Sequence, residues 1–271
     1  MARLHFRILG CGSSPGVPRI GGPTGADWGQ CDPTNPKNRR LRCSLLVRRR
    51  DVGSETRVLV DTGPDLREQC ISAGIDWADG VLYTHAHADH IHGIDDLRSF
   101  VLNRRKRVNV YLDERTSKRV REAFGYCFVT PEGSSYPPIL TEHRITAGEG
   151  VEVDGPGGRI TALPYTQAHG EIESLGFRFG PVAYSPDVSG MNDAALAALS
   201  GVEVLIIDAL RWTPHQSHFS VDQALEVIAK VKPRQAILTH MHIDLDYATL
   251  KARLPAYVEP AYDGLEFEVE A

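Results

Sequence analysis

The chain has 271 residues, with 30 Lys and Arg against 35 Asp and Glu, a formal net charge of −5 and 42% hydrophobic residues. These values are typical of an ordinary globular protein and exclude a disordered or fibrous chain. They give no electrostatic basis for stable nucleic-acid binding, and the sequence has no apolar window of about 18 residues that would span a membrane.

Short β-branched and aliphatic runs, bounded by Gly, Pro or Asp, predict strands along the chain. They cover residues 4–9, 57–60, 81–84, 107–112, 160–163, 182–185, 202–207, 235–239 and 265–269. Helices are predicted at residues 91–105, 115–124, 193–199, 221–231 and 247–254. Ser220 and Gln223 form a capping-box pattern before helix 221–231, and residues 130–138 predict an extended loop. Without a repeat or a long linker, this α/β chain indicates one domain over residues 1–271.

The cysteines and the N-terminal segment both indicate the cellular compartment of the protein. The five cysteines are scattered, odd in number and contain no CxxC pair, which argues against a disulfide framework and indicates a reducing compartment. His5 and Arg7 interrupt the apolar N-terminal run, so we interpret it as a first strand and not as a signal peptide. We therefore expect a cytoplasmic protein.

Ionisable residues follow several of the predicted strands. In open α/β sheets the ligand site lies outside the carboxyl ends of the strands, so residues distant in sequence can converge there. The residues in question are Asp61, His85, His169, Asp187, Asp208 and His240. Their positions predict a common site at one edge of the sheet.

The densest cluster is the segment His85-Ala86-His87-Ala88-Asp89-His90, between a predicted strand and a predicted helix. An extended backbone places His85 and His87 on the same side. Where the chain turns into the helix, Asp89 and His90 point elsewhere, which suits a second, adjacent metal ion. Histidine nitrogens and carboxylate oxygens without thiolates fit Zn, Mn or Fe. The alternative, a turn of solvated or helix-capping histidines, is disfavoured by four potential ligands within six residues.

Other polar features have simpler interpretations. The isolated histidines His5 and His143 are interpreted as surface or strand residues, and His92 as facing the start of the helix. The glycine-rich segment 10–14 lacks the GK[ST] of a phosphate-binding loop, and Pro15 and Pro18 oppose the helix that such a loop requires. This segment is predicted to be a turn near the site.

The HxHxDH segment, together with His169, Asp187 and His240, resembles the metallo-β-lactamase superfamily of metal-dependent hydrolases. Over essentially the whole chain, further segments resemble its PhnP-like phosphodiesterase group, which is itself similar to the tRNA 3′-processing endonucleases. These segments are Leu9-Gly10-Cys11-Gly12, Pro15-Gly16-Val17-Pro18, Val60-Asp61-Thr62-Gly63-Pro64, Tyr184-Ser185-Pro186-Asp187 and Leu238-Thr239-His240-Met241-His242. The resemblance implies an αβ/βα four-layer sandwich, with two sheets face to face, helices outside and the site at one edge.

The resemblance also implies two divalent ions per chain, Zn or Mn first and Fe as a further option, held by two ligand sets that one carboxylate bridges. The first set is His85, His87 and His169, the second is Asp89, His90 and His240, and the bridge is Asp187. Two ions about 3.5–4 Å apart can acidify a bridging water, orient it for in-line attack on phosphorus and neutralise the developing charge. We count Asp89 as catalytic as well as a ligand.

A leaving alkoxide also needs a proton from a positioned acid. His218 is the candidate, because its setting before the Ser220 cap resembles the family segment that carries a catalytic histidine. His215 is close enough to compete, and His242 either lines the pocket or bonds to a ligand residue. Asp61 and Asp208 are expected to fix ligand histidines by hydrogen bonding.

The chain departs from the group at one place. Members often carry a cysteine cluster for a structural zinc after the first glycine loop, but residues 21–32 retain only Cys31. We therefore predict no such zinc.

The leading hypothesis is hydrolysis of a small or cyclic phosphodiester, such as a phosphoribosyl cyclic phosphate or a nucleotide-like ester, by a protein that the resemblance suggests is a homodimer. A tRNA 3′-processing endonuclease is an alternative, but the Gly-rich and basic arm that it would use is not found. A thioester hydrolase of the glyoxalase II kind shares the HxHxDH segment. A non-catalytic nucleotide-binding protein is disfavoured by the complete ligand set.

Overall fold

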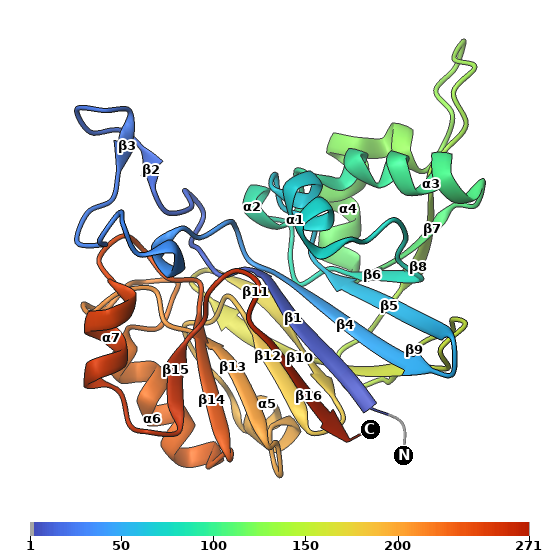
Figure 1. The fold of residues 1–271 in the computed structure, drawn as a ribbon. Helices are drawn as coiled ribbons and strands as arrows, with labels where there is room; N and C mark the ends of the chain where they lie inside the picture. The colour runs from blue at the N-terminus through green and yellow to red at the C-terminus, as the bar shows by residue number, and fades with distance from the viewer. Residues whose placement is uncertain (1–2, 271) are drawn as a thin grey trace.

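The computed structural model describes residues 3–270, in which two seven-stranded sheets lie face to face with helices on their outer sides (Figure 1). Apolar side chains from both sheets fill the space between them, and Phe6 of the first sheet meets Phe179 of the second with ring centroids 6.1 Å apart. This arrangement confirms the α/β sandwich that the sequence predicts. Of the helices described, none has the length and hydropathy needed to cross a bilayer.

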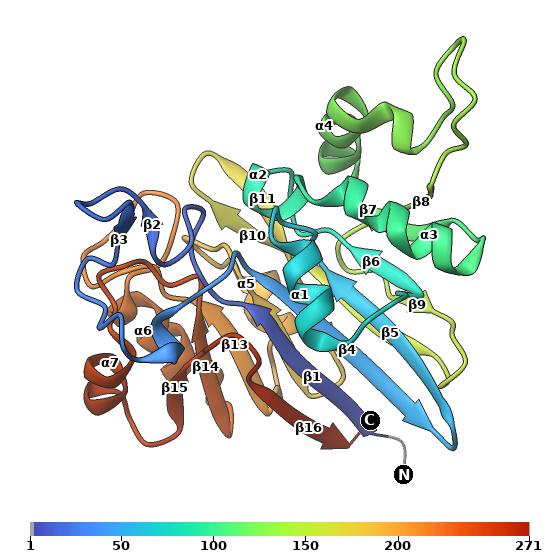
Figure 2. The same ribbon diagram turned by 45° about the horizontal axis from the view of Figure 1, so that its top comes forward.

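The first sheet has the strand order β16-β1-β4-β5-β6-β7-β8. Its strands are β1 (Arg3–Gly10), β4 (Ser44–Asp51), β5 (Ser54–Val60), β6 (Gly80–Leu82), β7 (Val108–Leu112), β8 (Leu140–Arg144) and β16 (Glu266–Glu270). Its outer face is covered by α1 (Leu66–Ala73), α2 (Ala88–Ile91), α3 (Arg98–Arg104), α4 (Glu114–Phe124) and the 3₁₀ turns η2 (Ile94–Leu97) and η3 (Gly125–Cys127). Figure 2 shows α1 and α3 over this face.

The second sheet has the order β15-β14-β13-β12-β11-β10-β9. Its strands are β9 (Val151–Val153), β10 (Ile160–His169), β11 (Ile172–Phe179), β12 (Val182–Ser185), β13 (Val204–Asp208), β14 (Gln235–Thr239) and β15 (Val258–Pro260). Its helices are α5 (Asp193–Ala198), α6 (Val221–Val231) and α7 (Tyr247–Arg253). A separate finger of β2 (Arg19–Ile20) and β3 (Ala26–Asp27), followed by η1 (Pro36–Asn38), projects beyond the end of this sheet, above α7 in Figure 1.

Strand direction explains why the site residues meet. Strands β5 and β6 are parallel in the first sheet, and β12, β13 and β14 are parallel in the second. Strand β10 is antiparallel to β11, which is antiparallel to β12, so β10 runs in the same direction as β12. Within each sheet the carboxyl ends of these strands therefore reach the same edge. The two edges lie together, because His85 after β6 and His169 at the end of β10 have ring centroids 5.0 Å apart.

Several predicted elements are found at their expected bounds, among them β12, β14 and α6. The capping box is confirmed, because Ser220 N donates to Gln223 Oε1 at 2.9 Å and Gln223 N donates to Ser220 Oγ at 3.3 Å. Residues 130–138 contain no helix or strand and form the expected extended loop, which projects beyond β8 (Figure 1).

Other elements differ from the prediction for identifiable reasons. Strand β4 was not predicted because it carries the basic run Arg48–Arg50, which resembles a solvated segment, yet β4 pairs with both β1 and β5. Strand β10 extends to His169, so this histidine ends a strand instead of following one. The predicted helix 91–105 is divided into α2, η2 and α3. The division falls at Gly93, where an added Cβ would lie 2.1 Å from the Gly63 carbonyl oxygen.

Candidate metal centre

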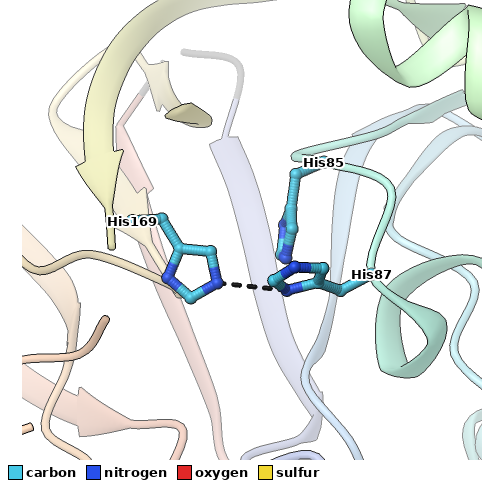
Figure 3. Close-up of side chains that lie close together, drawn as sticks. All are labelled: His85, His87 and His169. Carbon is cyan, nitrogen blue, oxygen red and sulfur yellow. Dashed lines mark hydrogen bonds between the residues drawn. The ribbon is translucent and has the colours of Figure 1, made fainter. Parts of the chain in front are cut away.

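Three histidines from the two sheets form the first group of potential ligands. His85 and His87 lie on the loop between β6 and α2, and His169 ends β10 in the opposite sheet. Their rings point toward one another (Figure 3), and His169 Nε2 lies 3.1 Å from His87 Nδ1. One nitrogen of each ring lies within 4.8 Å of the others, so the three can hold one ion.

A second group lies beside the first and is fully buried. It consists of Asp89 and His90 on α2, Asp187 after β12 and His240 after β14. His90 Nε2 lies 3.0 Å from Asp187 Oδ1 and 3.4 Å from Asp89 Oδ2. His240 Nε2 lies 3.3 Å from Asp187 Oδ2 and 3.6 Å from Asp89 Oδ2. These four side chains can hold a second ion.

Asp187 lies between the two groups. Its Oδ2 is 3.7 Å from His169 Nε2 and 3.9 Å from His85 Nε2, while both of its oxygens reach the second group. The carboxylate is only 1% exposed. It is therefore placed so that it can share its two oxygens between two ions.

The donor atoms of both groups fit divalent cations. The Nε2 atoms of His85, His90 and His240 and the Oδ1 of Asp187 are buried and make no hydrogen bond within residues 3–270. Polar atoms buried without a partner are unfavourable, and here they converge from several strands on one small region. Imidazole nitrogens and carboxylate oxygens without thiolates suit Zn, Mn or Fe.

Hydrogen bonds from outside the centre decide which ring nitrogen faces it. Thr84 Oγ1 donates to Asp61 Oδ2 at 2.8 Å, so its oxygen is free to accept from His85 Nδ1 at 3.0 Å. His169 Nδ1 donates to the Ser217 carbonyl at 2.6 Å. In both rings the Nε2 lone pair is then directed into the centre.

The charges of the two groups differ. Burial lowers the pKa of His85 well below its usual range and that of His169 to about 4, so both rings are neutral near pH 7 and can act as ligands. Burial also disfavours a charged His90, but the surrounding carboxylates, led by that of Asp187, outweigh it and raise its pKa. The second group thus stabilises a positive charge at its centre, which a divalent cation can supply.

Asp61 orients the His90 ring through a hydrogen bond. Its buried carboxylate accepts from His90 Nδ1 at 2.7 Å and from Thr84 N at 2.8 Å. Its φ of 64° lies in the left-handed region, which Asp and Asn tolerate better than most residues. The next turn is equally constrained, because a Cβ at Gly63 would lie 2.2 Å from the Asp89 carbonyl oxygen.

We expect Asp61→Asn to weaken metal binding by about 10- to 100-fold, as loss of an outer hydrogen-bond partner does in other metal sites. Asparagine keeps the backbone conformation but loses the charge that orients the His90 ring. Titration of the metal-free protein with Zn²⁺ against a competing chelator measures the change. Wild-type affinity in this variant would show that Asp61 does not act through His90.

His218 and Asp208 form a pair next to both groups. His218 Nδ1 donates to Asp208 Oδ2 at 2.7 Å, and Asp208 is held in turn by Val188 N at 3.0 Å. The His218 ring stacks on His240 with centroids 4.5 Å apart. His218 can also be grouped with His169 and Asp187 as a potential ligand. Its bond to Asp208 leaves Nε2 as the free nitrogen.

The other two histidines of this region have weaker support. His215 Nδ1 accepts from Ser217 N at 3.3 Å, and His242 Nδ1 lies 3.2 Å from Asp244 Oδ2, a partly exposed carboxylate. Both line a hollow of about 200 Å³ together with His218. The remaining histidines lie elsewhere: His5 pairs with Glu268, His143 bonds to Asn109 and His92 contacts Phe124.

Three contributors to the centre were not predicted from the sequence. Ser14 Oγ donates to Asp89 Oδ2 at 2.8 Å, which places the glycine-rich turn after β1 directly against a candidate ligand. Thr84 and the Ser217 carbonyl orient His85 and His169. Ser14 could have been identified from the sequence, because segment 10–14 is predicted to be a turn near the site. For Ser217, 48 residues from its partner, the sequence offers none.

The segment around Cys31 is held by buried contacts. Cys31 is buried against Val17 and Ile243. Arg40, which is 1% exposed, donates to the Leu245 carbonyl at 2.6 Å and to Asn38 Oδ1 at 3.2 Å. These bonds attach the base of the β2–β3 finger to the segment that follows His240.

Comparisons with known proteins identify the family of the chain and its fold. A family model described as a beta-lactamase superfamily domain matches residues 56–241. A solved structure described as a new diphosphatase from the PhnP family is 36% identical, with a TM-score of 0.85 over 99% of this chain and 98% of that chain. The short form of human tRNase Z is 16% identical, with a TM-score of 0.62 over 97% and 98% of the two chains, and shares the fold.

A curated relative, an octanoyltransferase of Porphyromonas gingivalis, is 31% identical over 264 residues, which is 96% of this chain. The chain spans 50% of the length of that relative. The name of the relative therefore describes a protein about twice as long as the matched region.

Proposed function

The chain belongs to the metallo-β-lactamase superfamily, as a PhnP-like metal-binding hydrolase, and from this premise we propose that it is a binuclear phosphodiesterase of small molecules. One observation carries the proposal: two adjacent groups of nitrogen and carboxylate donors share the Asp187 carboxylate. The proposed ligands are His85, His87 and His169 for one ion, Asp89, His90 and His240 for the other, and Asp187 for both.

The chemistry that two such ions supply when bound is an acidified water for attack on phosphorus and compensation of the charge that develops there. The chain itself orients the donors. Thr84, Ser217 and Asp61 hold three ligand rings with Nε2 inward, and Ser14 fixes the Asp89 carboxylate. Because these contacts exist before substrate arrives, little reorganisation is needed during the reaction.

Departure of an alkoxide requires a proton, and we assign its delivery to His218 Nε2. Asp208 accepts from Nδ1 and so stabilises the imidazolium and fixes the direction of Nε2. His215 lacks a comparable carboxylate partner among residues 3–270 and is the weaker candidate.

A diphosphate is the second candidate substrate class, favoured by the 36% identity to a structure described as a diphosphatase. Attack at phosphorus is common to both classes, but a phosphate leaving group departs without needing a proton. The Asp208–His218 pair therefore favours a phosphodiester with an alcohol leaving group. The likeness to tRNase Z concerns the fold, and the octanoyltransferase is a longer protein, so neither supports its own activity here.

The test is turnover of a substrate panel by protein of measured metal content. The panel holds bis(p-nitrophenyl) phosphate, cyclic ribose and nucleotide phosphates, a dinucleoside diphosphate, precursor tRNA and a glutathione thioester. We expect metal-dependent cleavage of the small phosphodiesters. Turnover of the thioester or of precursor tRNA alone would overturn the proposal, and preference for the dinucleoside diphosphate would favour the second class.

A further inference from the structure

A small hollow adjoins the candidate centre on the side of His218. It has a volume of about 200 Å³ and lies between the turn after β1 and the segment that follows β13. Its lining includes Ser13, Arg211, His215, His218, His240 and His242. The described residues that line it include one arginine and four histidines but no aspartate or glutamate, so the hollow suits a negatively charged group.

Arg211 is held in place by its own segment. Its Nε donates to the Thr213 carbonyl at 3.2 Å and its Nη2 to the Pro214 carbonyl at 2.9 Å. The backbone is also fixed, because Val221 N donates to the Arg211 carbonyl at 3.0 Å. No carboxylate within residues 3–270 lies at ion-pair distance from this guanidinium, which thus carries an uncompensated charge.

Ser13 supplies a second, independent indication of a ligand. Its side chain is 2% exposed, and its Oγ makes no hydrogen bond within residues 3–270 although it lines the hollow. Its backbone is anchored by a bond from Ser13 N to the Met241 carbonyl at 3.2 Å. A buried hydroxyl without a partner is unfavourable, and an anionic oxygen in the hollow would accept from it.

We propose that Arg211 and Ser13 form an anion subsite that binds a carboxylate or phosphate carried by the leaving group of the substrate. This inference rests on the proposed function, because His218 lines the same hollow and protonates the departing alcohol, which places that part of the substrate on this side of the centre. The Arg211 Nη1 group makes no hydrogen bond within residues 3–270 and can donate to an oxygen of such a group, and the serine hydroxyl can donate to another. The preferred substrate then has an anionic leaving group.

The test compares two phosphodiesters that differ in one charge, methyl 4-carboxyphenyl phosphate and methyl 4-carbamoylphenyl phosphate. We expect wild-type protein to prefer the carboxylate in kcat/KM. The Arg211→Gln variant should reduce that preference about 10- to 100-fold, the loss expected for one charge-assisted hydrogen-bonded pair. Arg211→Lys should retain part of it, and Ser13→Ala should reduce it by a smaller factor.

Arg107→Gln is the matched control, since Arg107 is exposed and lies outside the hollow. It should keep the wild-type preference. An unchanged preference in Arg211→Gln would overturn the subsite while leaving the phosphodiesterase intact. If wild-type protein cleaved neither of these esters nor any small phosphodiester of the substrate panel, the proposed function would fail. The subsite can then be tested by an NMR titration that measures the affinities for 4-hydroxybenzoate and 4-hydroxybenzamide. If the ratio of the two affinities is the same in Arg211→Gln as in wild-type protein, the subsite is overturned.

Discussion

Replacing Asp187 with asparagine is expected to remove at least one metal ion per chain and to reduce kcat by on the order of a thousandfold. The change keeps the shape of the side chain but removes the charge that lies 3.0 Å from His90 Nε2 and 3.3 Å from His240 Nε2. It also removes the acceptor that reaches His85 and His169 in the first group. Both ions would lose a shared ligand at once.

Metal content by mass spectrometry and turnover of bis(p-nitrophenyl) phosphate measure the two effects. Asp193→Asn is the matched control, because Asp193 is an exposed carboxylate in the first turn of α5 and its loss leaves the centre untouched. A variant at Asp187 that kept two ions and the wild-type rate would show that this carboxylate is not a shared ligand.

Replacing His218 with alanine is expected to slow esters of ordinary alcohols by about 10²- to 10⁴-fold, the usual contribution of a general acid. The loss on p-nitrophenyl esters should be below about tenfold, since p-nitrophenolate is stable as an anion and needs little protonation. Rates on methyl and p-nitrophenyl esters of the same phosphate, compared in one variant, measure the selectivity. Metal content must be unchanged, because His218 also lies close enough to the centre to act as a ligand.

Two further variants separate the alternatives for the acid. Asp208→Asn should show the same selectivity with a smaller loss, because it leaves His218 in place and removes the carboxylate charge beside its Nδ1. His215→Ala should show little selectivity, since its Nδ1 accepts from its own loop at Ser217. Equal losses on both esters in His218→Ala would exclude it as the acid, and a selective loss in His215→Ala would transfer the role to that residue.

The site could be anticipated from the sequence where chemistry is dense and local. His85, His87, Asp89 and His90 stand within one short segment. Alternation along an extended chain places His85 and His87 on one side, and the turn into the helix directs Asp89 and His90 elsewhere. His169 is isolated in sequence and emerges only when residues near strand ends are compared. Even there, the strand proved to continue to His169 itself, because β10 pairs with β11 over its last seven residues.

The sequence predicted the fold less completely where local composition or periodicity did not reflect the tertiary contacts of a segment. Three consecutive arginines obscured β4, although pairing with strands on both sides provides its backbone hydrogen bonds. Helix 91–105 was divided because the Thr62–Gly63 turn packs on Gly93, and Gly93 N donates to the Thr62 carbonyl at 2.8 Å. Neither contact can be read from periodicity, which reports only on a segment's own buried face.

The sequence alone determined the class of fold, the resemblance to metal-dependent hydrolases and the identity of the histidines and carboxylates that gather at the strand ends. The tertiary structure decided which nitrogen of each ring faces inward, through Thr84, Ser217 and Asp61, and which hydroxyl and guanidinium line the neighbouring hollow. The physical reason is the range of the interactions. Periodicity and motifs record what each segment does locally, whereas hydrogen-bond partners separated by tens of residues are set only when the two sheets pack.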